Sequence, residues 1–290
     1  MKSLYEYIVE AQKEGKAVGH FNISTLDGIW AVADAAQKLD LPVIIGISEG
    51  ERDYVGVKQA VAIVQSIRAE RGQAIFLNAD HTYSYERVVE AIDAGFDSVI
   101  FDGAKLSLEE NIAESKKCVQ YAQGKMSASG NQILVEAELG YIGTSSKVLD
   151  KLPEGAALGD SLTTSADALR FVQETGVNLF APAVGNIHGV VKGGDPALNP
   201  GRVAEISQAV GIPLVLHGAS GNTDAEIRQC IQSGVAVVHV NTELRLAYRQ
   251  GLSSSLVESP DEVSPYKYLR PAKEAMQKVA EDKLRVFNMM

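Results

Sequence analysis

Residues 74–101 read AIFLNADHTYSYERVVEAIDAGFDSVIF and contain the repeating unit from which the whole fold can be inferred. The apolar runs at 74–77 and 98–101 have the length and composition of buried strands. The stretch between them, 85–94, has apolar residues at helical spacing. It ends at Gly95, because glycine readily adopts the left-handed conformation that closes a helix. The segment therefore predicts one strand–helix–strand unit.

The same alternation runs along nearly the whole chain. We predict strands at 18–22, 42–47, 74–77, 98–101, 133–136, 179–183, 213–216 and 236–240, and helices at 26–38, 54–70, 85–94, 108–123, 165–175, 199–210 and 224–233. Strands that alternate with helices form a parallel sheet, and eight of them close into a (β/α)8 TIM barrel. The alternative is an open doubly wound sheet. It is weakened by the first turn, which reads FNISTLDG at 21–28 where a GxGxxG motif would be expected.

We expect residues 1–290 to form a single domain, because a barrel of this length commonly runs as one unit. Two further helices, at 243–256 and 265–287, follow the eighth strand and are expected to serve packing or dimerisation. The longest irregular stretch within the barrel is 145–161, rich in Gly, Pro and Ser. Such a loop is usually an active-site flap or a disordered surface piece.

Composition narrows the class of protein. The net charge of −10 argues against nucleic-acid binding, which needs a basic face. The first fifteen residues have no apolar stretch of the kind found in a signal peptide, and no run of about 18 apolar residues predicts a membrane span. The two cysteines, Cys118 and Cys230, lie far apart and fit a reducing compartment. We therefore expect a cytoplasmic protein.

Polar side chains gather at the carboxyl ends of the predicted strands, where barrel enzymes place their chemistry. A single histidine there is more often a hydrogen-bonded core residue than a ligand. Four of the five histidines of this chain fall at such ends, which reverses that expectation. The polar residues at these ends are Asn22, Ser48, Asp80, His81, Asp102, Glu138, His188, His217, His239, Asn241 and Thr242.

Three of these histidines, His81, His188 and His217, form a ligand set typical of a catalytic zinc ion with one open position. Such a site also accepts cobalt or iron. The ion would polarise a carbonyl group or generate hydroxide from water. Asp80, next to His81, is the natural general acid or base. The alternative role for Asp80 is to orient a histidine ligand.

Two glycine-bearing loops are candidate phosphate sites. LHGASGNTDAE at 216–226 joins the seventh strand to a helix, and its backbone from Gly218 through Ala219 to Gly221, with the Ser220 hydroxyl, is suited to an oxyanion near a helix N-terminus. Thr223 and Glu226 have the spacing of a capping box. The second loop, GNIHGVVKGG at 185–194, places Gly189 beside His188 and Lys192 four residues beyond it. Lys192 is as well explained by solvation as by an anion contact.

At this point the sequence resembles a known family. DH at 80–81, ELG at 138–140, GNIHG at 185–189, LHGASG at 216–221 and NTELRLA at 241–247 are similar to the signature blocks of class II ketose-bisphosphate aldolases. The resemblance runs from residue 21 to about 283. It implies a zinc-dependent TIM barrel, active in glycolysis or related carbohydrate metabolism. Such an enzyme reversibly splits a ketose 1,6-bisphosphate into dihydroxyacetone phosphate and an aldehyde such as glyceraldehyde 3-phosphate.

The resemblance assigns roles residue by residue. It implies Asp80 as the proton-transfer group, Glu138 as an alternative or indirect metal ligand, and Asp102 as a residue linked to a second, monovalent cation. The implied metal ligands are His81, His188 and His217. The implied phosphate and substrate contacts are Asn22, Ser48, Gly189, Gly218, Ser220 and Thr242. To these we add Lys192 and Ala219 from the two glycine-bearing loops and Asn241 from the end of the eighth strand.

Two departures from the family pattern fall at one barrel mouth. After ELG, members usually carry a glutamate on a mobile loop, the base that acts beside the carbonyl; here the segment is ELGYIGTSSKVL and Ser146 stands at that position. On the eighth strand an asparagine is usual, and here it is His239. Histidine titrates near neutrality, whereas an unaided serine has no useful basicity. We therefore predict His239 as the base; the alternative is a loop acid, Glu154 first.

The sequence thus predicts a metal-dependent aldolase acting on a phosphorylated ketose. Two alternatives remain: a metal-dependent barrel hydrolase or isomerase, and a non-catalytic sugar-phosphate sensor. The sequence does not choose between fructose and tagatose bisphosphates, nor does it exclude a deoxy or sulfonated aldehyde partner. By analogy with the family, we expect a homodimer or homotetramer.

Overall fold

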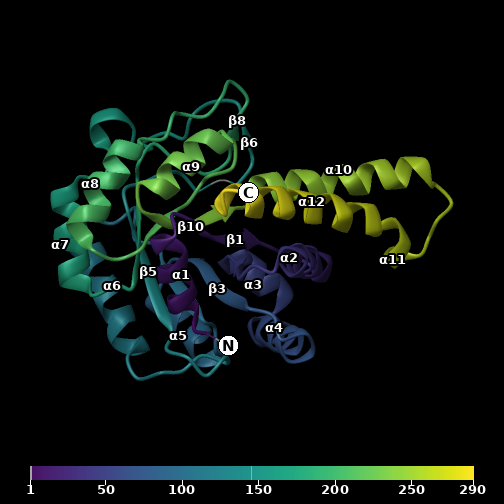
Figure 1. The fold of residues 1–290 in the computed structure, drawn as a ribbon, viewed down its shortest axis with the longest axis horizontal. Helices are drawn as coiled ribbons and strands as arrows, with labels where there is room; N and C mark the ends of the chain where they lie inside the picture. Colours follow the sequence, from purple (N-terminus) through teal and green to yellow (C-terminus); the bar gives the residue numbers. More distant parts are fainter. Residues whose placement is uncertain (1, 145) are drawn as a thin grey trace.

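The computed structural model describes residues 2–144 and 146–290, and its centre is a closed barrel of parallel strands (Figure 1). Around the barrel the order is β1-β10-β9-β7-β5-β4-β3-β2, and β2 pairs back onto β1. The strands are β1 (Val18–Asn22), β2 (Val43–Ile47), β3 (Ile75–Thr82), β4 (Ser98–Phe101), β5 (Leu134–Leu139), β7 (Leu179–Pro182), β9 (Leu214–Leu216) and β10 (Val235–Val240). The predicted (β/α)8 barrel is confirmed.

Helices cover the outside of the barrel. They are α2 (Leu26–Leu39), α3 (Glu49–Val55), α4 (Val57–Arg71), α5 (Tyr85–Ala94), α6 (Leu108–Ala122), α7 (Ser165–Thr175), α8 (Pro200–Val210) and α9 (Asp224–Gln232). Their ends follow local chemistry: in α5, for example, the Ser84 side chain accepts the backbone N–H of Arg87, and Gly95 closes the helix in the left-handed conformation. A single 3-10 turn, η1 (Gly159–Ser161), precedes α7.

The structure corrects three local predictions. The helix predicted at 54–70 is two helices, α3 and α4, divided at Gly56, which has φ +91°. Strand β3 continues to Thr82, so Asp80 and His81 lie within it and not after it. The loop predicted as irregular at 145–161 contains β6 (Val148–Leu149), which pairs with β8 (Val190–Val191). Residue 145 itself lies outside the described residues.

The barrel interior changes character from one end to the other. At the amino end, helix α1 (Leu4–Lys13) closes the barrel, and its Leu4 and Ile8 belong to an apolar cluster with inward side chains of the strands, including Ile44 and Phe76. At the carboxyl end the buried inward side chains are polar: His20, Asn22, Asn78, Asp80, Glu136, Glu138, His217 and His239. The fold thus combines an apolar plug with a polar mouth.

The C-terminal helices α10 (Thr242–Glu258), α11 (Pro265–Tyr268) and α12 (Arg270–Phe287) form a hairpin that projects beyond the barrel (Figure 1). The two appended helices predicted from the sequence are confirmed, although the second is divided at Leu269. In the described part of the chain, none of the helices combines the length and the apolar composition that a membrane span requires.

Candidate metal centre and active site

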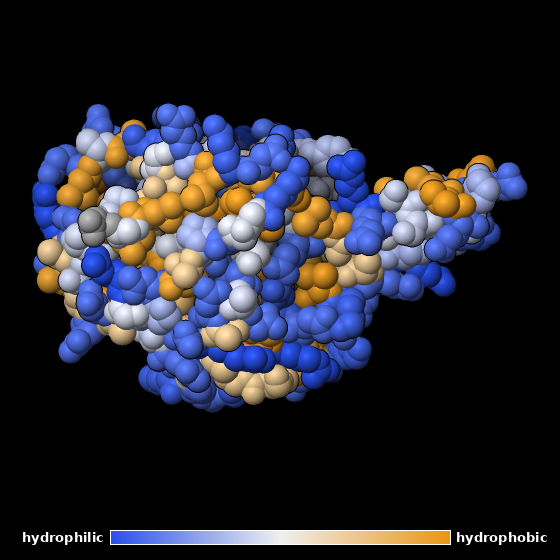
Figure 2. All heavy atoms as spheres, turned by 90° about the horizontal axis from the view of Figure 1, so that it is seen from above, coloured by the Kyte–Doolittle hydropathy of each residue, from blue (hydrophilic) through white to orange (hydrophobic). Residues whose placement is uncertain are grey.

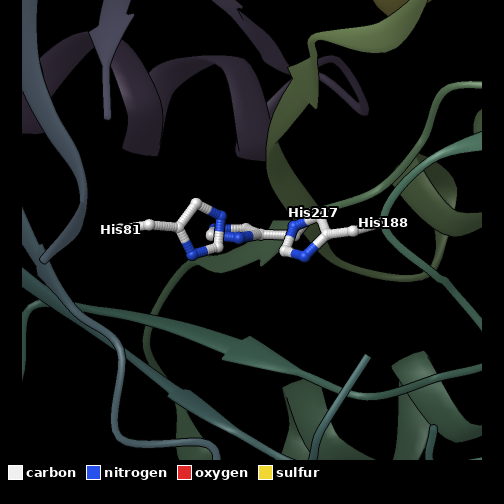
Figure 3. Close-up of side chains that lie close together, drawn as sticks. All are labelled: His81, His188 and His217. Carbon is white, nitrogen blue, oxygen red and sulfur yellow. The ribbon is translucent and has the colours of Figure 1, made fainter. Parts of the chain in front are cut away.

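Three histidine side chains meet at the carboxyl mouth of the barrel (Figure 3). His81 lies near the end of β3, His188 in the loop after β7, and His217 directly after β9. Each offers a ring nitrogen, and these nitrogens lie within 4.8 Å of one another. The ring centroid of His81 is 4.6 Å from that of His188 and 5.0 Å from that of His217. The predicted triad is therefore brought together.

Each of these rings has one nitrogen engaged by a protein acceptor, which leaves the other free for an ion. Metal-binding histidines are usually held in this way, since the acceptor fixes both tautomer and orientation. The three donor–acceptor pairs are His81 Nδ1 to Asp102 Oδ2 at 3.0 Å, His188 Nδ1 to the Gly143 carbonyl at 2.7 Å, and His217 Nε2 to Glu136 Oε1 at 2.7 Å.

Glu138 supplies an unpaired buried oxygen at the same place. Its Oε1 lies 2.9 Å from His217 Nδ1 and 3.1 Å from His81 Nδ1. Neither Glu138 Oε1 nor His217 Nδ1 completes a hydrogen bond within the described residues. Because buried polar atoms without a partner are costly, unpaired nitrogen and oxygen atoms facing one point indicate a place for a ligand. These residues fit a divalent cation, with His81, His188 and His217 as ligands and Glu138 as a possible further one.

The ionisation of the cluster is strongly perturbed. Burial alone would lower the pKa of His81, but Asp80, Glu138 and Asp102 raise it to about 9. Burial, and then the charge of His81, lower the pKa of His188 to about 4. Against the effect of burial, His217 and His81 lower the pKa of Glu138 to about 2. Without an ion, protons on the histidine rings therefore neutralise the negative charge of the buried carboxylates. A bound cation would displace these protons and neutralise the same charge.

The backbone at His81 is unusual. Its φ is +40°, a left-handed value rare for a residue with a side chain, and the pairing of β3 with β4 shifts register between Ala79 and Thr82. Such irregularities re-aim side chains and concentrate at functional sites. Here the irregularity directs the imidazole of His81 into the mouth of the barrel.

Asp80 lies beside the triad with one oxygen unpaired. Asn22 donates its side-chain N–H to Asp80 Oδ2 at 2.7 Å, whereas Oδ1 is buried without a hydrogen-bond partner among the described residues. Burial would raise the pKa of Asp80, but His81 and His239 lower it well below its ordinary value. The carboxylate is thus anionic at neutral pH and has a free acceptor oxygen.

His239 lines the inner part of the mouth, as predicted, but it is packed between two other histidines. Its ring stacks on His20 at a centroid distance of 3.4 Å and on His217 at 4.0 Å. Its Nδ1 lies 3.5 Å from Asp80 Oδ1. Burial, followed by the charges of His20 and His217, lowers the pKa of His239 well below its ordinary value, so the ring is neutral.

An open cavity of about 390 Å³ leads to this centre. Asp80, His81 and His188 form its inner wall, and its outer wall includes Ser48, Tyr83, Ser146, Lys147, Asn241 and Arg245. The Ser146 hydroxyl accepts a hydrogen bond from the side chain of Asn241 at 3.1 Å. Glu154, the alternative base, is exposed and is not among the described residues that line this cavity.

The predicted phosphate contacts divide into two groups. A second pocket at the barrel mouth, here called the inner pocket, contains the first group. Its lining includes Gly189, Gly218, Ser220 and Thr242, together with Asn22 and Asn241. Among the described residues that line either pocket, Lys192 and Ala219 do not appear: the Lys192 ammonium pairs with Asp150 at the surface, and Ala219 is buried.

The helix that begins beside this pocket is α10 and not α9. The N-terminus of α9, where we expected phosphate, is closed by the reciprocal hydrogen bonds of Thr223 and Glu226. By contrast, Thr242 is the first residue of α10, and the Asn241 side chain makes no capping bond. Among the described residues no side chain caps the first backbone N–H groups of α10, which makes this helix the better partner for an anion.

The chain is similar to known proteins over nearly its whole length. Residues 2–290 match the family model "Fructose-bisphosphate aldolase class-II". The chain is 36% identical over 288 residues to the probable fructose-bisphosphate aldolase of Bacillus subtilis (strain 168) and 35% identical to the fructose-bisphosphate aldolase of Staphylococcus aureus. Each alignment covers 98% of this chain and 96% of the relative.

Solved structures show the same likeness. The YdjI aldolase from Escherichia coli K12 superposes with a TM-score of 0.79 at 28% identity, covering 99% of this chain and 96% of that chain. A putative fructose-1,6-biphosphate aldolase from Coccidioides immitis superposes with a TM-score of 0.80 at 28% identity, covering 98% and 96%.

Proposed function

The chain belongs to the class II fructose-bisphosphate aldolase family, and from that premise we propose how its own residues carry out the reaction. The enzyme is a carbon–carbon lyase that cleaves a ketose bisphosphate. The observation that supports the proposal most strongly is the triad His81, His188 and His217, whose ring nitrogens lie within 4.8 Å of one another, with Glu138 Oε1 2.9 Å from Nδ1 of His217.

The triad would hold a divalent cation, which supplies Lewis-acid activation of the substrate carbonyl. Three imidazoles favour zinc, and cobalt or iron also suit them. Glu136, Gly143 and Asp102 would keep the three rings in place. A monovalent cation near Asp102 stays a prediction.

We assign Asp80 the proton transfer that accompanies cleavage. Its unpaired Oδ1 would accept the proton of the C4 hydroxyl as the C3–C4 bond breaks, and the electron pair of that bond would remain with the dihydroxyacetone phosphate fragment. The low pKa keeps the carboxylate deprotonated at neutral pH. Asn22 orients the carboxylate through its other oxygen.

Proton exchange at the carbon next to the substrate carbonyl requires a second base. We propose His239 for this role. It lines the inner pocket as a neutral ring, whereas Glu154 is exposed. We expect His239→Asn to slow exchange of the dihydroxyacetone phosphate proton with deuterium oxide by about 100-fold or more, the usual scale for loss of a general base. Glu154→Gln is the matched control and should leave exchange unchanged. Exchange that survives in the first variant and fails in the second would return the role to the loop.

We propose that the ketone-side phosphate binds the inner pocket formed by Gly189, Gly218, Ser220 and Thr242. Ser220→Ala should chiefly raise KM for a phosphorylated substrate, because one charge-assisted hydrogen bond contributes about 1.5–3 kcal/mol. The measurement is steady-state kinetics, with Ser161→Ala as the control because Ser161 lies outside both pockets. An unchanged KM would remove Ser220 from the phosphate site.

We propose that the open cavity leading to the metal centre determines which ketose bisphosphate the enzyme accepts. Glu49 also lines the outer wall of this cavity and Arg245 pairs with Glu51, so we propose Lys147 as the cation that meets an anionic aldehyde end. A coupled assay for triose phosphate with fructose and tagatose 1,6-bisphosphates in parallel tests the proposal and identifies the preferred stereoisomer. Turnover of either supports it. Binding without turnover would indicate a sensor, and release of inorganic phosphate a hydrolase.

We also propose a homodimer or homotetramer that assembles through the projecting hairpin. Apolar side chains gather on one side of this arm near its far end (Figure 2), and Val257, Val263 and Tyr266 are each more than 70% exposed. Exposed apolar clusters of this kind mark interaction surfaces. The family relationship and the two buried free thiols support a cytoplasmic location.

A further inference from the structure

Helix α3 holds the segment that carries His81. Arg52 Nη1 donates to the backbone carbonyl of Asp80 at 3.2 Å, and Arg52 Nη2 donates to Thr82 Oγ1 at 3.1 Å. One helical turn earlier, Glu49 Oε1 accepts the backbone N–H of Tyr83 at 2.8 Å. Two side chains of one short helix therefore grip residues 80–83 on both sides of the metal ligand.

Arg52 is an unusual residue in itself. It is completely buried, and among the described residues no carboxylate lies within 4.0 Å of its guanidinium. Its Nε also has no hydrogen-bond partner there. Arginine is almost never fully buried without an ionic partner, because an unpaired buried charge is costly. A buried arginine without an ionic partner is therefore expected to have a role that an apolar side chain could not fill.

The contacts of Arg52 show what that is. Its Nη1 also donates to the carbonyl of Ile47 at 2.9 Å, so the planar guanidinium ties the end of β2 to the irregular end of β3. His81 has φ +40° at that irregular end. A left-handed residue with a side chain persists only where its surroundings hold it. Arg52 holds the carbonyl before His81 and the hydroxyl after it.

We propose that Arg52 is a positioning residue for the metal centre, which keeps the backbone of His81 in the conformation that aims its imidazole at the ion. The inference rests on the proposed metal site. The rigid fork of an arginine matches this task, because it reaches three acceptors at fixed angles; a lysine ammonium on a flexible stem does not.

Arg68 provides a matched control at the opposite end of the same strand. Its Nε donates to the carbonyl of Ile75, the first residue of β3, at 2.6 Å, and its guanidinium pairs with buried Asp97. Both arginines thus bind backbone of β3, but Arg52 is fully buried and acts at the metal end, whereas Arg68 is partly buried and acts at the amino end. Loss of either should lower the melting temperature, and only loss of Arg52 should affect the ion.

The test measures the dissociation constant for Zn²⁺ by competition with a chromogenic chelator in the wild type, Arg52→Met, Arg52→Lys and Arg68→Met. We expect Arg52→Met to bind Zn²⁺ about 10–100-fold more weakly, the scale for loss of groups that orient metal ligands. Arg52→Lys should recover only part of this loss, and it serves alone if the methionine variant does not fold. The Co²⁺ complex of Arg52→Lys should also have a visible absorption spectrum that differs from that of the wild type, because ligand geometry determines that spectrum. Arg68→Met should bind Zn²⁺ as the wild type does.

Two results would overturn the inference. The first is a dissociation constant and a Co²⁺ spectrum in the Arg52 variants equal to those of the wild type. The second is an equal weakening in Arg68→Met, which would reveal general destabilisation of the strand. Failure of the wild type itself to bind Zn²⁺ would overturn the metal site, which is a distinct outcome.

Discussion

His217→Ala is expected to yield a folded protein that holds no stoichiometric divalent metal and cleaves ketose bisphosphate at least about 10³-fold more slowly. Metal activation of a carbonyl supplies several kcal/mol, and each 1.36 kcal/mol is tenfold in rate. His217 is chosen because it is the most buried of the three ligands, and Glu136 holds its ring through Nε2.

The measurements are metal content after gel filtration and the rate of triose phosphate release. The matched control is His20→Gln, which changes another buried histidine of the same barrel mouth outside the triad. That variant should retain its metal. Native metal content in His217→Ala would show that the three-histidine assignment is wrong.

Asp80→Asn is expected to keep the metal and to lose cleavage. The amide matches the carboxylate in shape and has no basicity, so we predict that kcat falls about 10²–10⁴-fold, the range for removal of a general acid or base. Exchange of the dihydroxyacetone phosphate proton should be largely retained, because that step does not involve the C4 hydroxyl. The pattern is the reverse of the one expected for His239→Asn.

The control for this carboxylate is Asp195→Asn, a partly buried aspartate outside both pockets of the active site. It should leave kcat unchanged. If Asp80→Asn turned over at the native rate, or failed because its metal was lost, Asp80 would be an orienting partner of His81 and not the proton acceptor.

Much of the fold could be predicted from the sequence because its signals are local. The apolar run at 74–77, the amphipathic 85–94 and Gly95 each reflect the physics of a single element, and the barrel follows from their repetition. The three histidines could be predicted in the same way, since the carboxyl ends of parallel strands meet at one mouth.

Two inward side chains were missed although a simple rule would have found them. Successive residues of a strand face opposite sides, so positions two apart share a face. His20 precedes Asn22 by two residues on β1, and Glu136 precedes Glu138 by two residues on β5. The prediction used only the last residue of each pair. The rule would have placed His20 and Glu136 inside the mouth.

Other features depend on tertiary contacts and leave no local signal. The left-handed backbone of His81 is stabilised by Arg52, 29 positions earlier in the chain. Lys192 had the spacing of an anion contact, but its ammonium group forms an ion pair with Asp150. Likewise, the capping box predicts where α9 begins, but it does not predict which helix N-terminus lies beside the pocket. That helix is α10, because it begins directly after β10, whose end lines the pocket.

Cleavage by metal-free protein is the sharpest measure of whether the reaction depends on the ion. The chain is treated with a chelator, passed through a desalting column, and assayed for triose phosphate with its preferred ketose bisphosphate before and after addition of Zn²⁺ or Co²⁺. We expect cleavage to disappear with the metal and to return in proportion to the ion bound, up to one ion per triad of His81, His188 and His217. Undiminished cleavage by protein shown to contain no metal would contradict this expectation.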